Sequence, residues 1–151
     1  MFAQTINLHI TRVFADQILG ALTNRPAAAL LDAPLNVHLY TLRTNPIGIS
    51  PLPADFTECT YDGYAEVPVT VPNTVVQVPN GLGDGNPANA LFVSAGISTP
   101  ENAMGYYLTD GGDTVLYGWE DFPTPIPMGV VLGDFLDLNF FVAIAYLMAV
   151  Q

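Results

Sequence analysis

Residues 102–138, NAMGYYLTDGGDTVLYGWEDFPTPIPMGVVLGDFLDL, contain the pattern that decides the fold. Met104–Thr109 and Thr114–Trp119 are rich in aromatic and β-branched residues, which favour a pleated, half-buried surface. Between them, Asp110-Gly111-Gly112-Asp113 supplies residues that adopt positive φ angles in a tight reversal. Gly133-Asp134 then precedes another apolar run. The stretch predicts a β-hairpin followed by a third strand, with the proline-rich segment 122–127 as a stiff, extended connector.

Upstream of this stretch, the hydrophobic period changes along the chain. Residues 1–10 nearly alternate between apolar and polar and are expected to form an extended N-terminal arm. Apolar residues recur at helical spacing from Ile10 to Leu22, so an amphipathic helix is expected over about 11–22, stopped by Pro26. Asn36–Leu42 alternates with a period of two, which predicts a strand.

The remaining segments have the pattern of short strands separated by turns. Phe56–Ala65 has β character with a turn or bulge at Asp62-Gly63, and Leu91–Ile97 is expected to be an apolar strand. Prolines place 66–78 at a sheet edge or between strands, because proline has no ladder donor. Residues 80–90 predict a surface loop, and 140–150 a buried strand.

The fold expected from these elements is one β-rich domain over residues 11–151, with strands from about residue 36 onward. Its class is mainly β, an antiparallel β-sandwich or small barrel of about seven to eight strands with one N-terminal amphipathic helix.

The charge balance excludes one large class of partners. The chain has 151 residues with fourteen carboxylates, three arginines and no lysine, and its formal charge is −11. Binding of nucleic acid needs a basic face that neutralises phosphates, so DNA and RNA are not expected partners. The most apolar run, Phe140–Val150, is shorter than the roughly 20 residues of a membrane helix, and the N-terminus lacks the pattern of a secretory signal. No membrane partner is expected.

Titratable and nucleophilic residues form no catalytic motif. His9 and His38 have no carboxylate at motif spacing, and the lone Cys59 cannot form an internal disulfide. Cys59 and His38 could meet in space as nucleophile and base, but a small core side chain is the commoner role of such a cysteine. Glu120 and Asp121 are neighbours on an expected strand, so they point to opposite faces and cannot flank one glycosidic bond.

Acids and glycines in the expected loops have some of the chemistry of ligand sites. Asp110–Asp113 and Asp84-Gly85-Asn86 offer oxygen ligands for calcium, but neither has the spacing of a helix-loop-helix site, and turn acids commonly bond their own backbone. Gly81–Gly85 superficially suggests a phosphate loop, yet no lysine or helix-forming segment follows it. We therefore expect no catalytic residue, no bound metal and no cofactor.

The order of landmarks along the chain resembles a known class of protein. The landmarks are the N-terminal helix, Leu39-Tyr40-Thr41-Leu42, Thr44-Asn45-Pro46, Asp55–Ala65, Gly105–Asp110, Val115–Trp119, the Pro125/Pro127 segment and Gly133-Asp134 before a terminal apolar strand. In this order they resemble small virion structural proteins of tailed bacteriophages, of the capsid decoration or cement type. Residues 66–90, rich in Pro, Val and Gly, and the lack of lysine depart from that pattern and concern loop lengths and the contact surface.

The resemblance implies a non-enzymatic virion structural protein. Its expected place is the outer capsid surface, where it would bind the major capsid protein, stabilise the capsid and associate with itself as a homotrimer at threefold sites. An acidic chain suits a place away from packaged DNA. The alternatives are a tail or neck component, a carbohydrate- or receptor-binding β-module with a platform of exposed Tyr and Trp, and a hydrolase.

Partner contacts are expected from apolar residues on the arm and in the proline-rich loop. The predicted residues are Phe2, Ile6, Leu8, Ile47, Ile49 and Leu52. Apolar side chains on such segments reach a neighbour easily, although those of the arm could equally fold back on the core.

Overall fold

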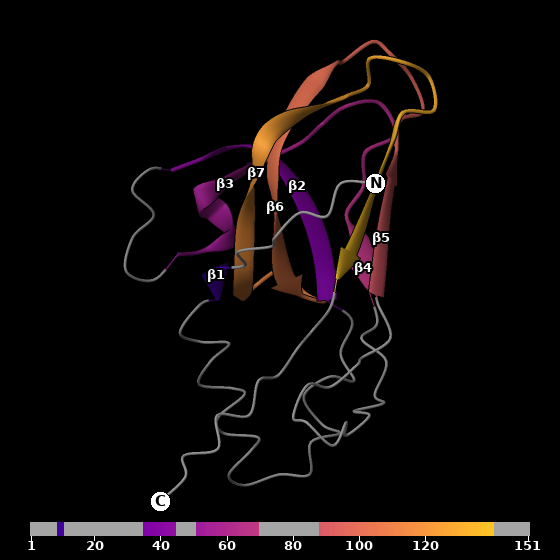
Figure 1. Ribbon diagram of the computed structural model, residues 1–151. Coiled ribbons are helices and arrows are strands. Elements are labelled where there is room, and N and C mark those ends of the chain that lie inside the picture. The colour runs from indigo at the N-terminus through magenta and orange to yellow at the C-terminus, as the bar shows by residue number, and fades with distance from the viewer. Residues whose placement is uncertain (1–8, 11–34, 45–50, 70–87, 141–151) are drawn as a thin grey trace, which may run out of the picture.

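The computed structural model describes residues 9–10, 35–44, 51–69 and 88–140, which form a mainly β structure (Figure 1). Eight strands and one 3₁₀ turn lie within these residues. They are β1 (His9–Ile10), β2 (Leu35–Arg43), η2 (Pro53–Asp55), β3 (Phe56–Glu58), β4 (Val67–Val69), β5 (Ala88–Val93), β6 (Glu101–Asp110), β7 (Leu116–Met128) and β8 (Phe135–Phe140). The predicted mainly β, antiparallel class is confirmed for this part of the chain.

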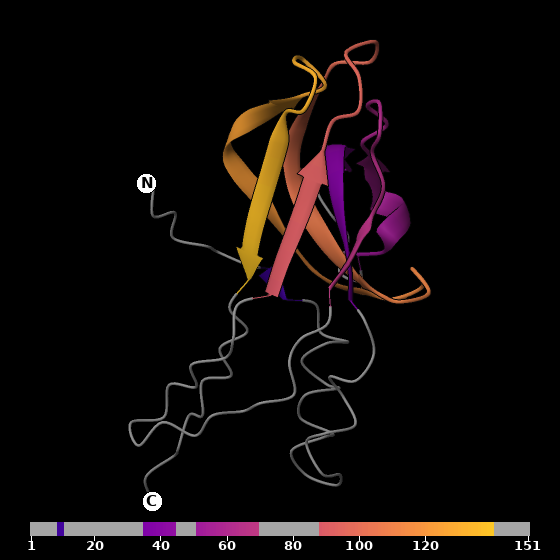
Figure 2. The same ribbon diagram turned by 90° about the vertical axis from the view of Figure 1, so that its right-hand side faces the viewer.

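The strands form two antiparallel sheets (Figures 1 and 2). The larger sheet has the order β1-β7-β6-β2-β3, and β4 pairs with β2 as well. Along one edge of β2, β4 pairs with Leu35–Val37 and β3 with Tyr40–Arg43, while β6 occupies the other edge. The smaller sheet consists of β5 and β8. β2 therefore lies inside the larger sheet, with partners on both edges.

The hairpin predicted around the Asp110–Asp113 turn is present, and its strands are longer than expected. β6 and β7 pair antiparallel along most of their lengths. The carboxylate of Asp110 accepts hydrogen bonds from the backbone N–H groups of Thr114, at 2.6 Å, and Val115, at 2.8 Å. Asp113 has a φ of 56°, a positive value that Asp tolerates better than most residues. The acids of the turn thus hold its backbone, as the sequence predicts.

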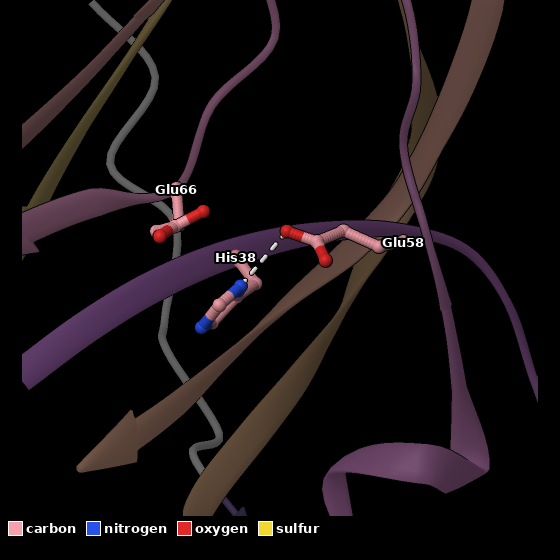
Figure 3. Close-up of side chains that lie close together, drawn as sticks. All are labelled: His38, Glu58 and Glu66. Atoms are coloured by element: carbon pink, nitrogen blue, oxygen red, sulfur yellow. Dashed lines mark hydrogen bonds and ion pairs between the residues drawn. The ribbon is translucent and has the colours of Figure 1, made fainter. Parts of the chain in front are cut away.

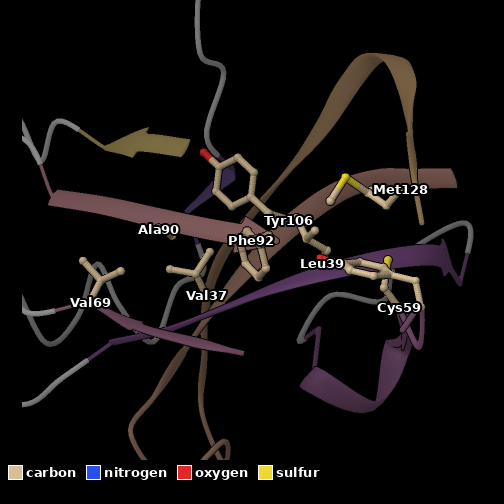
Figure 4. Packing of buried hydrophobic residues seen from close by; sticks show 10 residues of the cluster. Val37, Leu39, Cys59, Val69, Ala90, Phe92, Tyr106 and Met128 are labelled. Atoms are coloured by element: carbon tan, nitrogen blue, oxygen red, sulfur yellow. The ribbon is translucent and has the colours of Figure 1, made fainter. Parts of the chain in front are cut away.

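The main apolar core lies between the two sheets (Figure 4). Val37 and Leu39 of β2 and Phe92 of β5 are each at most 2% exposed. Burying a side chain of this size contributes roughly 1.5–3 kcal/mol, so packing in this core stabilises the fold substantially. The other buried members of this core are Cys59, Tyr61, Val69, Ala90, Ala103, Tyr106 and Met128.

The opposite face of the larger sheet carries aromatic and polar side chains. Tyr40, Phe56 and Tyr107 are buried there, and the rings of Phe56 and Tyr107 stack with centroids 4.7 Å apart. Gly105, the β6 partner of Tyr40, makes room for the Tyr40 ring, because a Cβ at this position would collide with the Tyr40 hydroxyl and a β7 carbonyl. Strand β2 is therefore buried on both faces.

The connector predicted over residues 122–127 is wrong, because this segment belongs to β7. The pairing of β6 with β7 shifts register between Ala103–Ile126 and Gly105–Asp121, so Pro123 and Pro125 lie in an irregular stretch that has no paired residue on β6. An antiparallel ladder uses the N–H of only every second residue of a strand. Pairing with β6 is therefore compatible with these prolines, and Pro127 lies opposite Asn102.

Three other predicted bounds also differ from the structure. The strand expected over 91–97 begins at Ala88, inside the expected 80–90 loop, and ends at Val93. Beyond Val93 the backbone N–H of Ser94 still donates to the Asp134 carbonyl, at 2.8 Å, and the chain then turns away from the pairing with β8. The β character expected over 56–65 is confined to β3, and a turn follows in which Gly63 has a φ of 85°.

Several predicted elements fall outside the described residues. These are the helix over 11–22, positions 1–8 of the arm, most of the 66–78 and 80–90 segments, and 141–150 of the terminal strand. The described part of 66–78 includes β4, which pairs with β2 and no other described strand, as a sheet-edge segment should. No helix in the described ranges is long and apolar enough to cross a membrane.

Candidate functional site

A polar cluster surrounds His38 on the face of the larger sheet that carries Tyr107. The imidazole of His38 is 3% exposed and stacks on the Tyr107 ring, with centroids 4.5 Å apart and planes 8° from parallel. Its Nδ1 lies 2.8 Å from Glu58 Oε1. Its Nε2 lies 2.9 Å from Thr109 Oγ1 and 3.0 Å from Asp113 Oδ1. Both ring nitrogens of this buried side chain are therefore partnered, each with a carboxylate.

Strand pairing brings these residues together. β2 pairs with β6 on one edge, which places the end of β6 and the following turn, with Thr109 and Asp113, beside His38. β3 pairs with β2 on the other edge and presents Glu58. The positive φ of Asp113 turns its carboxylate toward the sheet, where it also accepts hydrogen bonds from Asn36 Nδ2, at 3.0 Å, and Thr109 Oγ1, at 2.6 Å.

The electrostatics of the cluster favour the charged forms of its members. Burial lowers the pKa of His38, but the hydrogen bond and charge of Glu58, together with those of Asp113, outweigh burial and leave the pKa raised. Burial also raises the pKa of Glu58, and hydrogen bonds from His38 and Tyr64 outweigh it, so that this pKa is lowered. The pKa of Asp113 is lowered in the same way, with Thr109 as its strongest opposing partner.

A second glutamate, Glu66, completes a group that could hold a metal ion (Figure 3). His38, Glu58 and Glu66 each offer one ligand atom, and these atoms all lie within 4.8 Å of one another. Figure 3 shows both carboxylates near the Nδ1 side of the ring, while Nε2 faces the other way. Glu66 is exposed and stands just before β4, so the group opens toward solvent.

Cys59 does not join this cluster. Its side chain is 1% exposed and belongs to the apolar core, with Leu39, on the face of the larger sheet opposite to His38. Burial, followed by the charges of Glu101 and Glu58, raises the pKa of the Cys59 thiol to about 12. The prediction of a core side chain is confirmed, and a nucleophile–base pair of Cys59 with His38 is not formed.

The adjacent acids Glu120 and Asp121 point to opposite faces of β7, as expected. Glu120 is buried and accepts a 2.7 Å hydrogen bond from the Tyr106 hydroxyl. Asp121 lies in a shallow depression between β2 and β7, where Arg43 binds it through Nε at 2.8 Å and Nη2 at 2.7 Å. The Tyr40 hydroxyl also donates to Asp121. Both carboxylates therefore have a structural role in these contacts, and none of the contacts pairs either carboxylate with a second acid.

The second notable feature is an apolar surface on the smaller sheet. Val93 of β5 lies opposite Phe135 of β8, and these side chains are 46% and 70% exposed. The loops 94–100 and 129–134 adjoin them at one end of the sheet (Figure 2). Of the ten exposed large hydrophobic residues in the described part of the chain, seven lie here. We call these seven the β5–β8 apolar surface: Leu91, Val93, Ile97, Val130, Val131, Leu132 and Phe135.

The predicted contact residues are mostly not placed. Phe2, Ile6, Leu8, Ile47 and Ile49 lie outside the described residues. Leu52 is described and is 57% exposed, so it is accessible to a partner, and its role in contact stays a prediction. The β5–β8 apolar surface was not among the predicted contacts.

Comparisons of the chain with known protein families, with curated proteins and with solved structures found no match.

Proposed function

We propose that this chain is a non-enzymatic virion structural protein of a tailed bacteriophage, a decoration protein that binds the outer face of the major capsid protein through the β5–β8 apolar surface. The observation that carries the proposal is that seven of the ten exposed large hydrophobic residues in the described part of the chain lie on β5, on β8 and in the two loops at one end of that sheet. Contiguous apolar patches on soluble proteins commonly mark sites of protein association. Exposed apolar residues gathered at one end of a small sheet fit a protein that binds its neighbours through side-chain contacts.

Two further features support the virion setting. The order of landmarks in the sequence resembles small phage virion proteins, and the formal charge of −11 suits a place away from packaged DNA. Association of three copies at threefold axes of the capsid is part of the proposal, because closed symmetry would also cover exposed apolar area on each copy.

The alternatives receive less support from the described residues. The carbohydrate-binding platform expected from the sequence consists of exposed Tyr and Trp rings, yet the six described tyrosines and Trp119 are buried or half-buried. A hydrolase needs a nucleophile within reach of a base and of substrate. Thr109 Oγ1, the hydroxyl that contacts His38, is on a residue with 0% exposure, so substrate does not reach it in this geometry.

The first test is the copy number of the chain in purified particles of the virus that encodes it, by quantitative mass spectrometry against the major capsid protein. A ratio near that of the capsid protein is expected. A small fraction would move the protein to the tail or neck, and absence from the particle would overturn the virion proposal.

A second test locates the contact by a matched pair of substitutions. Leu132→Ser removes a side chain of the apolar surface that is 71% exposed, and Leu42→Ser removes one that is 64% exposed on β2. Neither side chain is in the core, so both variants should fold. Leu132→Ser should reduce incorporation into particles lacking the protein, whereas Leu42→Ser should not. Equal incorporation of both variants would contradict this placement of the contact.

A further inference from the structure

The Nε2 side of His38 has the arrangement that orients a metal-binding histidine. A histidine that binds metal through one ring nitrogen usually donates the N–H of the other to a carboxylate or carbonyl, which fixes the tautomer. His38 Nε2 has this partner in Asp113 Oδ1, at 3.0 Å, with Thr109 Oγ1 at 2.9 Å. With the proton on Nε2, the lone pair of Nδ1 points to the side where Glu58 and Glu66 lie.

The chemistry of the Nδ1 side suits a divalent cation. Three carboxylates, those of Glu58, Glu66 and Asp113, surround one imidazole. A protonated His38 leaves this group with a net charge of −2, and a dication on a neutral His38 would leave −1 (three carboxylates against one or two positive charges). One nitrogen and two carboxylate ligands with an open fourth position match the donors that zinc accepts.

The geometry needs little change to close around an ion. Ligand atoms of a tetrahedral zinc site lie about 3.4 Å apart, as bonds of about 2.0–2.1 Å require. The three atoms here lie within 4.8 Å of one another, and Nδ1 and Glu58 Oε1 are already 2.8 Å apart. Glu66 is exposed, and no hydrogen bond to another described residue holds its carboxylate away from the other two ligands. The Tyr64 hydroxyl, 2.6 Å from Glu58 Oε1, would keep that carboxylate oriented.

We propose that His38 Nδ1, Glu58 and Glu66 form a binding site for a divalent transition metal ion of the zinc type, with Asp113 as the residue that positions His38. The ion takes the place of the proton that Nδ1 otherwise shares with Glu58, and water completes its coordination. This site is separate from the β5–β8 apolar surface, and it differs from the sequence-based expectation of no bound metal.

The test is titration of the full chain, freed of metal with a chelator, with Zn²⁺, followed by calorimetry and by thermal unfolding. At a Zn²⁺ concentration about 100 times Kd, binding to the folded state should raise Tm by roughly 5–10 °C. Glu66→Gln should weaken binding at least about tenfold and roughly halve that rise, measured against the metal-free Tm of the same variant. Tetrahedral Co²⁺ absorption bands should appear in the wild type and not in this variant.

The matched control is Asp137→Asn, which removes an exposed acid on β8. It should bind Zn²⁺ as the wild type does. Equal binding by the wild type and Glu66→Gln would overturn the proposal and assign the binding to the acidic surface in general. Mg²⁺ binding as tight as Zn²⁺ binding would also overturn it, because an imidazole ligand selects against Mg²⁺.

Discussion

The two faces of the larger sheet are both buried, but they are built differently. On one face, Val37 and Leu39 of β2 pack against the smaller sheet in a core that is almost wholly apolar. On the other, the alternate residues His38 and Tyr40 lie among rings and carboxylates and are held by hydrogen bonds. Strand β2 thus contributes side chains to two kinds of interior, because its successive residues point to opposite faces of the sheet.

Directional contacts, namely hydrogen bonds between side chains, are concentrated on the face that carries His38 and Tyr40. An apolar face tolerates imprecise geometry, because the hydrophobic effect is not directional. A polar interior is stable only when its groups find partners, because an unpartnered buried polar group costs about 1–3 kcal/mol. The second face is therefore where substitutions that preserve shape should still matter, and where a ligand could be held.

The largest effect is expected from the apolar core. Phe92→Ala should lower the free energy of unfolding by about 3–5 kcal/mol, because it leaves a cavity at a side chain that is 2% exposed. Its neighbour Leu91, 53% exposed on the outer side of the same strand, gives the control, and Leu91→Ala should change stability by less than about 0.5 kcal/mol. Urea unfolding followed by circular dichroism measures both. Similar losses in the two variants would show that the inner and outer sides of β5 are assigned wrongly.

The thiol on the apolar face should be almost inert. Burial raises the pKa of Cys59 from 9.0 to about 12, which lowers the thiolate fraction by about 1,000-fold. Alkylation by iodoacetamide at pH 8 should therefore be slower by at least that factor in the folded chain than in urea, as followed by mass spectrometry. Rapid alkylation under native conditions would place Cys59 outside the core.

The same substitution on the two faces should have opposite signs. Tyr40→Phe removes a hydroxyl that donates to Asp121 and, at 3.2 Å, to the Glu120 carbonyl, and should cost about 1–2 kcal/mol. Tyr61→Phe, on the apolar face, removes a buried hydroxyl without a partner in the described part of the chain. It should be neutral or stabilise by up to about 1 kcal/mol. Chemical denaturation of both variants distinguishes them, and equal destabilisation would contradict the contrast between the faces.

The smallest effect is expected at the rim of the polar face. Arg43 and Asp121 form an ion pair whose side chains are 28% and 44% exposed, and such pairs contribute about 0.2–1 kcal/mol. Arg43→Gln should lower the free energy of unfolding by no more than that, and the loss should shrink at 1 M salt, where screening is strong. A larger loss that persists in salt would show that the pair belongs to the buried polar interior.

Local patterns predicted the elements whose signals are local. The hairpin at Asp110–Asp113 and the strand over Asn36–Leu42 follow from turn chemistry and from a period of two, and both are present. The prolines of 122–127 predicted a connector where a strand is present. Whether a strand tolerates proline depends on which of its N–H groups the neighbouring strand uses, and the sequence does not state this. The pairing of β5 with β8 was not predicted either, since no sequence pattern states which strands meet.

The candidate site was less predictable than the fold. Asp113 was recognised as a turn residue, but its contact with His38 depends on the pairing of β2 with β6. Glu58 and Glu66 reach the same ring only because β3 and β4 share an edge of β2. The apolar surface was missed for another reason: apolar residues occupy both faces of β5, so the sequence does not distinguish the buried Phe92 from the exposed Leu91.

The three alternate prolines of β7 have a consequence for how copies of the chain behave at high concentration. Beyond Trp119, β7 has no partner among the described strands on the edge away from β6. Such an edge ordinarily invites another chain to add a strand and begin an aggregate. Prolines at 123, 125 and 127 lack N–H donors and lie in or beside the register shift of β7, so an added strand would meet an irregular edge with gaps in its ladder. Crowded copies can therefore meet through side chains without fusing through their backbones.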